Sequence, residues 1–545
     1  MTAGRWALVA VLLAVLCAPT RPVAPVSTPI HSYADAVRHT VWVDTGTARV
    51  AADVIRPRTA KPVPVIMVTS PYNTTLGRGL EEQLKAYDLS GAPTSFPLFL
   101  DNYFVPRGYA VVQVDLPGSG RSSGCLDVGG PGEVGAAKAV VDWLNGRATG
   151  HTSVAGGETA AATWSTGDVG MVGKSWDGTI AIGLAGTGVE GLRTIVPIGA
   201  ISSWYDYYRA NGTELDSGTP AGLAAQVDND KGCPYGGLAA PSLNPDDEMW
   251  RARDYRRTAG NVRASVFAVH GLGDTNVRPL HLGLWWPLVT TPKRIWLGQA
   301  GHADPFDFRR AEWVAALHQW FDHYLLGLDN GAPTGLSVEH APDRWSEYPG
   351  WPAGGSVEYR PTADGGLGAV PGEGVLAFAD DQRPAEAWLT DPESGRLLFR
   401  TPPLTVETRL SGVASLRLAA EGDRVSAVLV DFGPVRARDR ADEGVRKVGS
   451  RSCWGESTGV DSACYLDTAT PTSVVDRRVL ATAWARAGGV VEFPLGAVDV
   501  VIPAGHRVGL VVGGTDRAAL PEGGGGEVRV DLAGTVLRLP VVSGF

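Results

Sequence analysis

A serine, an aspartate and a histidine each follow a short apolar segment in the middle of the 545-residue chain. They are Ser175 after residues 169–172, Asp274 after residues 266–269 and His302 after residues 295–297. Cleavage of an ester or amide bond by a serine requires an activated hydroxyl, a histidine that takes its proton and a carboxylate that orients the histidine. The sequence therefore predicts that Ser175, Asp274 and His302 form a catalytic triad.

The segment around Ser175 has the pattern of a sharp turn between a strand and a helix. Gly173 leaves room for a tight bend, and the apolar residues after the serine can begin a helix. Hydrolases of the α/β-hydrolase fold hold their nucleophile in such a turn and carry the triad in the order serine, aspartate, histidine. A Gly-x-Ser pair alone is equally typical of a structural turn, and Asp177 stands where a second glycine is usual, with Gly178 one residue later. The prediction therefore rests on the three residues together.

An oxyanion that forms at the serine needs two hydrogen-bond donors. The backbone N–H of Trp176, directly after the nucleophile, is one candidate. The hydroxyl of Tyr72, which follows an early apolar segment, is the second, although an aromatic residue there can equally serve in packing. Asp304 and Asp307 lie close to His302 but have no further ligand pattern, so we expect Asp304 to cap a helix and predict no metal and no cofactor.

Apolar and amphipathic segments alternate between residues 37 and 330. The expected strands cover residues 65–68, 109–114, 169–172, 266–269 and 295–297, and the expected helices cover residues 133–144 and 312–326. Such alternation is typical of a mostly parallel sheet with helices on both faces. Asp274 and His302 come directly after strands, at the sheet edge where parallel sheets place their sites. The fold class predicted for residues 37–330 is therefore α/β, as an α/β-hydrolase domain.

Two further regions differ from this pattern. Residues 204–257 are rich in aromatic and acidic side chains, and we expect them to form a helical cap over the site. Residues 335–545 contain short valine-rich segments separated by glycine and proline, which is typical of an all-β sandwich of the jelly-roll type. Because jelly rolls often bind sugars, a secreted carbohydrate-binding protein is an alternative of another functional class, which an intact triad disfavours.

Several motifs resemble those of the Xaa-Pro dipeptidyl-peptidase family, which also includes cocaine-esterase-like and α-amino-ester hydrolases. The motifs are Gly173-Lys174-Ser175-Trp176, residues 201–209 with the sequence ISSWYDYYR, residues 270–276 with the sequence HGLGDTN, and residues 502–507 with the sequence IPAGHR. The resemblance extends from about residue 40 to the C-terminus. It implies a serine peptidase whose substrate is a peptide with a free N-terminus and proline at the second position, from which it releases the dipeptide.

The resemblance also assigns substrate-binding residues. They are Trp204 and Tyr207 for an aromatic pocket around the proline ring, and Asn276 for a polar group that binds the free amine. The family glutamate that holds this amine has no counterpart in residues 218–223, so Glu214 or Asp216 is expected to replace it. The missing glutamate favours an alternative, an esterase or acylase that acts on small acyl or α-amino esters. At their helical spacing, the aromatic residues can also simply pack the cap.

The N-terminus and the overall charge indicate where the protein acts and with which partners. Arg5 precedes an apolar stretch, residues 6–17, which has the length of a signal-peptide core and is too short to span a bilayer. Residues 1–27 are therefore expected to be the signal peptide of a secreted protein that has no membrane contact after cleavage. The net charge of −10 argues against a nucleic-acid partner, which would need a basic face, so none is expected.

The cysteines fit an exported protein. Of the five cysteines, one lies in the predicted signal peptide, which leaves an even number that suggests two disulfides. Cys453 and Cys464 are close in sequence, and we expect them to bond to each other. This pairing leaves Cys125 to bond with Cys233.

Overall fold

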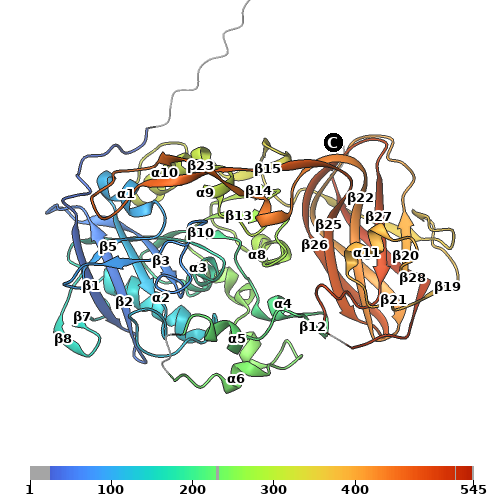
Figure 1. Cartoon of the computed structure of the whole chain (residues 1–545), viewed down its shortest axis with the longest axis horizontal. Helices are drawn as coiled ribbons and strands as arrows, with labels where there is room; N and C mark the ends of the chain where they lie inside the picture. Colours follow the sequence, from blue (N-terminus) through green and yellow to red (C-terminus); the bar gives the residue numbers. More distant parts are fainter. Residues whose placement is uncertain (1–24, 229–231, 522, 543–545) are drawn as a thin grey trace, which may run out of the picture.

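The computed structural model describes residues 25–228, 232–521 and 523–542. The signal peptide predicted for residues 1–27 therefore lies almost wholly outside the described residues. Within the described part of the chain, no helix has the length and apolar character needed to cross a membrane. Two units lie side by side, one a large sheet flanked by helices and the other a sandwich of two smaller sheets (Figure 1).

A twelve-stranded sheet forms the centre of the first unit. In order across the sheet, its strands are β16 (Arg344–Tyr348), β15 (Gly335–Ala341), β14 (Lys293–Gly298), β13 (Ser265–Gly271), β10 (Leu192–Ile198), β9 (Ser165–Lys174), β3 (Val63–Ser70), β6 (Ala110–Asp115), β2 (Arg49–Arg56), β1 (Val37–Asp44), β7 (Gly150–Ser153) and β8 (Gly156–Thr159). From β15 to β6 all neighbours run parallel. The predicted mostly parallel sheet of an α/β-hydrolase is thus confirmed.

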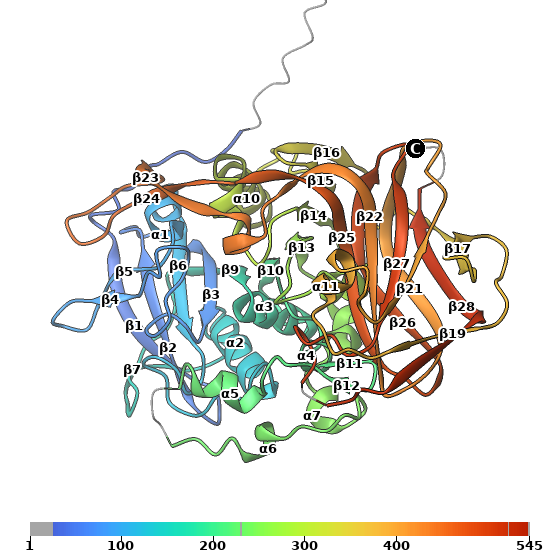
Figure 2. The ribbon, with the colours of Figure 1, turned by 45° about the vertical axis from the view of Figure 1, so that its right-hand side comes forward.

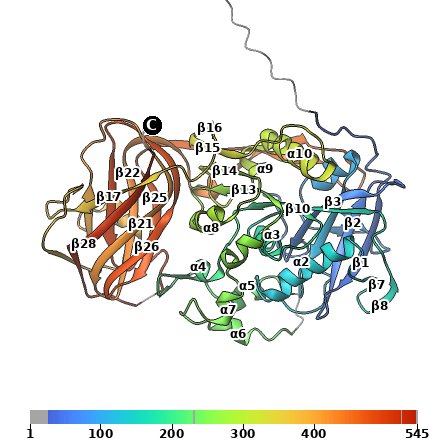
Figure 3. The same cartoon turned by 180° about the vertical axis from the view of Figure 1, so that it is seen from behind.

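Helices cover both faces of this sheet. They are α2 (Pro131–Leu144) and α3 (Trp176–Gly186) on one face, and α1 (Leu100–Phe104) and α10 (Arg310–Leu326) on the other. Successive residues of β3 point to opposite faces. Val65 and Met67 pack in the core shared with α2 and α3, whereas Ile66 and Val68 pack in the core shared with α1 and α10. Figure 3 shows α2 and α3 together on the first of these faces.

The cap consists of short elements rather than long helices. These are α4 (Trp204–Tyr208), β11 (Arg209–Ala210), β12 (Thr213–Glu214), α5 (Pro220–Ala225), α6 (Gly236–Ala239), α7 (Glu248–Arg251) and the 3₁₀ helix η2 (Tyr255–Asn261). The Cys125–Cys233 disulfide ties the cap to the loop before α2, as predicted. The cap also touches the sandwich, because the Asn211 side chain donates a hydrogen bond to the carbonyl of Trp484 at 2.9 Å.

The second unit is the predicted β-sandwich. In order across the first sheet, the strands are β18 (Leu367–Gly368), β17 (Gly355–Pro361), β28 (Glu527–Val541), β21 (Thr408–Glu421) and β26 (Gly489–Ile502), and β19 (Val375–Ala379) also pairs with β28. In order across the second sheet, they are β20 (Arg396–Arg400), β27 (Arg507–Gly513), β22 (Arg424–Arg438) and β25 (Thr472–Arg486). A separate hairpin, β23 (Arg446–Cys453) and β24 (Cys464–Ala469), carries the predicted Cys453–Cys464 disulfide. It lies on the first unit near α1 (Figure 2), where the Tyr465 hydroxyl donates to the carbonyl of Leu98 at 2.6 Å.

The large sheet continues past the predicted end of the catalytic domain at residue 330. Strand β15 pairs parallel with β14, and β16 pairs antiparallel with β15, so the sheet extends to Tyr348. The apolar pattern of a strand does not reveal which sheet the strand joins, and this is why residues 335–348 were assigned to the sandwich from the sequence.

Candidate active site

Ser175 lies at a sharp turn between β9 and α3. Its backbone angles, φ 63° and ψ −125°, are rare for a residue other than glycine. The strand and the helix approach closely here: a Cβ atom on Gly173 would lie 2.5 Å from the Cβ of Asp177, and one on Gly178 would lie 2.6 Å from the carbonyl oxygen of Gly173. Gly178 therefore provides the close approach that the usual glycine provides one residue earlier.

Asp177, which occupies that usual glycine position, is fully buried. Its carboxylate lies 3.0 Å from the guanidinium of Arg78, which also donates a hydrogen bond to the carbonyl of Lys174 at 3.4 Å. Burial raises the pKa of Asp177 to about 6, and the positive charge of Arg78 opposes this rise. A buried ion pair thus supports the turn that presents Ser175.

Asp274 and His302 follow β13 and β14. The Nδ1 atom of His302 lies 2.7 Å from Oδ2 of Asp274. Oδ1 of Asp274 accepts hydrogen bonds from the backbone N–H groups of Asn276 at 3.0 Å and Val277 at 2.8 Å. These contacts orient the imidazole with its Nδ1–H toward the carboxylate. The Nε2 atom of His302 is buried and makes no hydrogen bond to any described group, so it is available as a proton acceptor.

The serine and the histidine both lie beside the end of β10. The backbone N–H of Ser175 donates to the carbonyl of Ile198 at 2.8 Å. The next residue, Gly199, lies against the histidine, since a Cβ atom there would be 3.2 Å from both Nδ1 and Cε1 of His302. Glycine suits this position because φ is 49° and because the ring leaves little space for a side chain. The structure thus gathers Ser175, Asp274 and His302 at the carboxyl ends of neighbouring parallel strands.

A pocket of about 390 Å³ opens beside Ser175. Its walls include Tyr72, Trp176, Trp204, Tyr207, Tyr208 and Asn276. The ring of Trp204 packs edge-to-face against Trp176 and Tyr207, with centroids 5.7 and 5.6 Å apart. The Tyr207 hydroxyl donates a hydrogen bond to Oδ1 of Asn276 at 2.8 Å. The aromatic residues therefore pack the cap and line the pocket at the same time. The two roles that the sequence suggested for them, packing the cap and forming a pocket, are thus compatible.

The two acidic residues expected at the pocket are elsewhere. Glu214 stands opposite Arg209 in the β11–β12 hairpin, and its carboxylate lies 3.0 Å from that guanidinium. Asp216 is exposed, and its backbone N–H donates to the carbonyl of Ala519 in the sandwich at 2.7 Å. Within the described part of the chain, no acidic residue lines the pocket. The structure thus brings the predicted aromatic residues and the amide to Ser175 but not these acids.

The two oxyanion candidates are also at the pocket. Trp176 is the first residue of α3, where backbone N–H groups have no acceptor within the helix. Its indole N–H donates to Glu133 at 2.7 Å, and Glu133 also accepts the backbone N–H of Gly129 at 2.8 Å. Tyr72 packs edge-on against Trp176, with ring centroids 6.1 Å apart. Burial and the nearby charge of Asp177 raise the pKa of Tyr72 far above its usual value, so its hydroxyl keeps its proton.

Three charged residues at the site were not predicted from the sequence. Glu133, in the first turn of α2, is fully buried, and its carboxylate accepts the indole N–H of Trp176. The Lys174 ammonium donates to the carbonyl of His302 at 2.8 Å. Glu443 belongs to the sandwich unit, and its carboxylate accepts the backbone N–H of His302 at 2.7 Å. No local pattern marks Glu443, which lies 141 residues from the histidine.

Asp304 caps a helix, as expected. Its side chain accepts the backbone N–H of Phe306 at 2.9 Å and begins α9 (Pro305–Phe308). Among the described residues, no group of three or more metal-binding side chains is placed to hold an ion.

The parallel sheet and the geometry around Ser175 define the class of protein, an α/β-hydrolase with the residues of a serine enzyme. The sequence model of the X-Pro dipeptidyl-peptidase family, S15, matches residues 45–234 and 239–304. The model of the X-Pro dipeptidyl-peptidase C-terminal non-catalytic domain matches residues 327–536. The chain therefore belongs to the X-Pro dipeptidyl-peptidase family of serine peptidases, as its motifs indicated.

Named relatives agree with this assignment, and solved structures resemble the chain in fold. A protein from Streptomyces avermitilis, provisionally named a Xaa-Pro dipeptidyl-peptidase, is 44% identical over 100% of this chain and 90% of its own length. A Xaa-Pro dipeptidyl-peptidase from Lacticaseibacillus rhamnosus is 32% identical over 68% of this chain and 52% of its own length. An α-amino acid ester hydrolase superposes with a TM-score of 0.62 at 16% identity, covering 97% of this chain and 100% of its own. A CocE/NonD family hydrolase from Staphylococcus aureus superposes with a TM-score of 0.66 at 14% identity, covering 93% of this chain and 94% of its own. The two structures share the fold.

Proposed function

We propose that this protein is a secreted serine peptidase that releases Xaa-Pro dipeptides from the N-termini of peptides. The observation that carries the proposal is the pocket beside Ser175, which combines aromatic walls with the amide of Asn276 in a chain of the S15 family. A proline ring is a rigid apolar group that fits between aromatic side chains. In this proposal, Trp204 and Tyr207 enclose the proline ring, and the scissile carbonyl lies over Ser175.

The reaction proceeds through an acyl-enzyme. Ser175 Oγ attacks the carbonyl carbon of the proline residue while Nε2 of His302 takes the hydroxyl proton, and Asp274 stabilises the resulting imidazolium. The backbone N–H of Trp176 and the hydroxyl of Tyr72 bind the oxyanion. The imidazolium then protonates the leaving amine, and a water molecule activated by the same histidine hydrolyses the ester.

Asn276 is proposed to bind the free amino terminus of the substrate. Its Oδ1 atom accepts the Tyr207 hydroxyl at 2.8 Å, and an amide oxygen has a second lone pair for an ammonium N–H. A hydrogen bond with one charged partner contributes about 1.5–3 kcal/mol. Because Glu214 and Asp216 lie away from the pocket, neither carboxylate adds to the hydrogen bond between the substrate ammonium and Asn276. Blocking the amine should therefore lower kcat/KM by about tenfold to a hundredfold.

Secretion is supported by the cysteines. All four cysteines outside the predicted signal peptide are bonded in two pairs, and such pairs persist in oxidising compartments outside the cytosol. Expression in a bacterial host with residues 1–27 intact should place the mature protein in the medium. N-terminal sequencing of that protein then gives the cleavage site, and a protein retained uncleaved in the cytosol would contradict export.

The activity is tested by mass spectrometry of a peptide that begins with Ala-Pro. The purified protein should release the Ala-Pro dipeptide and leave a chain shortened by two residues, and Ser175→Ala should leave the peptide intact. Rapid cleavage of small acyl esters with no shortening of the peptide would instead support the esterase or acylase alternative, which neither the family match nor the named relatives favour.

A further inference from the structure

We propose that Glu443, a residue of the β-sandwich unit, is a positioning residue for the catalytic histidine. Its side chain holds the loop of His302 in the conformation in which the imidazole serves Ser175. This inference rests on the role proposed above for His302 as the general base. It gives the sandwich, which corresponds to the domain described as non-catalytic in the family, a part in the reaction.

Glu443 makes two hydrogen bonds to consecutive residues of the histidine loop. Its carboxylate accepts the backbone N–H of His302 at 2.7 Å, and its carbonyl accepts the backbone N–H of Gly301 at 3.0 Å. A Cβ atom on Gly301 would lie 1.9 Å from the carboxylate oxygen, so only glycine leaves room for this approach. On the other side, the Lys174 ammonium binds the carbonyl of His302 at 2.8 Å. Charged side chains thus hold the backbone N–H and the backbone carbonyl of the histidine.

The turn that carries Glu443 has an uncommon shape. It is the 3₁₀ turn η4 (Ala441–Gly444), in which Asp442 and Glu443 have φ values of 50° and 58°. Non-glycine residues adopt such angles at an energetic cost and keep them where the surroundings determine the conformation. Here the left-handed backbone directs both the carboxylate and the carbonyl of Glu443 to the same loop.

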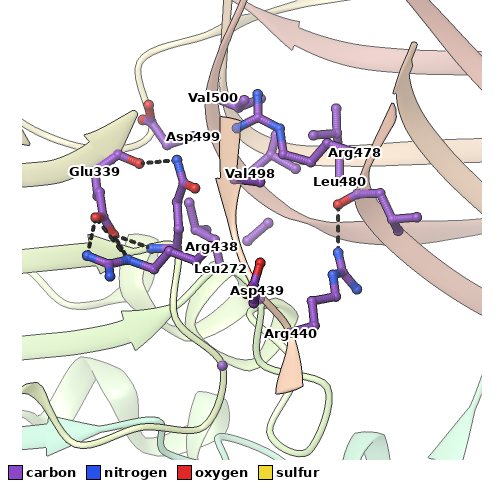
Figure 4. Close-up of a pocket in the computed structure, with 16 residues that line it drawn as sticks. Leu272, Glu339, Arg438, Asp439, Arg440, Arg478, Leu480, Val498, Asp499 and Val500 are labelled. Atoms are coloured by element: carbon purple, nitrogen blue, oxygen red, sulfur yellow. Dashed lines mark hydrogen bonds and ion pairs between the residues drawn. The ribbon is translucent and has the colours of Figure 1, made fainter. Parts of the chain in front are cut away.

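The start of the histidine loop is held by the same stretch of the sandwich. The buried guanidinium of Arg438, at the end of β22, lies 2.5 Å from the carboxylate of Glu339. Glu339 in turn accepts the backbone N–H of Gln299 at 2.8 Å. Figure 4 shows Arg438 and Glu339 joined at one side of the cavity between the two units. Residues 438–443 therefore hold the loop from Gln299 to His302 at both of its ends.

This loop needs support from outside. Its sequence, Gln299-Ala300-Gly301-His302, follows Gly298, and glycines allow the backbone many conformations. Transfer of a proton from Ser175 requires Nε2 at hydrogen-bond distance, and a displacement of about 1 Å can lower a rate by about a hundredfold. The contacts of Glu443 restrict the loop at the histidine itself, so their loss should affect the chemical step rather than substrate binding.

The test compares variants of Glu443 with a matched change at Asp442, the adjacent carboxylate in the same turn. Glu443→Ala removes the acceptor, and Glu443→Gln keeps an oxygen at the same reach. Glu443→Asn tolerates the left-handed backbone but is one methylene too short. The control is Asp442→Asn, since the Asp442 side chain is exposed and makes no hydrogen bond or ion pair within the described part of the chain. Each full-length variant is assayed for kcat and KM with Ala-Pro p-nitroanilide and for the rate at which a fluorophosphonate labels Ser175.

Glu443→Ala and Glu443→Asn should lower kcat and the labelling rate by roughly tenfold with KM within about twofold of wild type. Glu443→Gln should have a kcat and a labelling rate within about threefold of the wild-type values, and Asp442→Asn should have the wild-type values. Equal labelling rates in all proteins would overturn the proposal, and so would a Gln variant as slow as the Ala variant. A wild-type protein that the fluorophosphonate does not label would instead refute the roles of Ser175 and His302. Thermal unfolding confirms that the variants compared are folded.

Discussion

Replacing Asp274 by asparagine should nearly abolish activity while leaving the fold intact, because the structure determines how the new amide turns. On one side, the carboxylate faces two donors, the backbone N–H groups of Asn276 and Val277 at 3.0 and 2.8 Å. On the other side, it faces Nδ1 of His302 at 2.7 Å, while Nε2 of His270 lies farther away at 3.7 Å and is hydrogen-bonded to the carbonyl of Val277. The amide oxygen is expected to face the two N–H groups, so the NH₂ group points at the histidine.

This orientation forces the histidine into the wrong tautomer. Nδ1 of His302 must accept a hydrogen bond from the amide, so its proton moves to Nε2, which then cannot take the proton of Ser175. Turning the amide the other way would leave two buried donors unsatisfied at about 1–3 kcal/mol each. The cost of leaving both donors unsatisfied is at least about 2 kcal/mol. At that cost, only about 3% of the molecules hold the tautomer in which Nδ1 carries the proton and Nε2 can accept one. The loss of the charge that stabilises the imidazolium acts in addition, and the expected fall in kcat is roughly 10³–10⁴-fold.

The assay measures kcat and KM for Ala-Pro p-nitroanilide together with the thermal unfolding midpoint. KM should change little, because Asp274 is buried behind the histidine. The matched control is Asp304→Asn, a buried carboxylate two residues from His302 that caps α9, a role that asparagine fills equally well. The kcat of this control should stay within about threefold of the wild-type kcat. A folded Asp274→Asn enzyme that keeps more than about a tenth of the wild-type kcat would refute the reasoning.

Three further predictions concern the nucleophile, the amine site and the turn below Ser175. Ser175→Ala should lower kcat by on the order of 10⁴-fold or more with an unchanged circular dichroism spectrum, and a fully active variant would mean that another serine is the nucleophile. Asn276→Ala should narrow the difference in kcat/KM between free and acetylated Xaa-Pro substrates, whereas an equal loss on both would argue against an amine site. Asp177 has a pKa of about 6 in the folded protein against 3.8 for the unperturbed group, so the folded state binds more protons between these values. Its contribution to the free energy of unfolding should therefore fall as pH rises from about 4 to about 6, by up to ~3 kcal/mol. Urea unfolding of wild type and Asp177→Asn across this range measures the effect, and a pH-independent difference between them would contradict it.

The strands that carry the residues of the proposed triad could be predicted from the sequence because the signals are local. Ser175 follows its strand directly, Asp274 and His302 lie in the loops just after theirs, and the parallel sheet brings the ends of these strands together. The role of Gly178 was less evident, because the close approach of α3 to β9 appears only in three dimensions.

The fate of several charged residues could not be predicted, since it depends on pairings between distant or folded segments. Glu214 seemed available for a substrate amine until the hairpin placed it opposite Arg209. Glu133 lies buried against Trp176, a contact between two helices that no local pattern indicates. Glu443 reaches His302 only because the sandwich docks on the first unit.

The central claim is tested most directly by comparing kcat/KM for Ala-Pro p-nitroanilide and for the same substrate with an acetylated amine, with Ser175→Ala as the blank. We predict hydrolysis of the free substrate with a kcat/KM about tenfold to a hundredfold above that of the blocked one. Equal turnover of the two substrates, or hydrolysis of simple acyl esters but of neither anilide, would contradict the assignment as a dipeptidyl-peptidase.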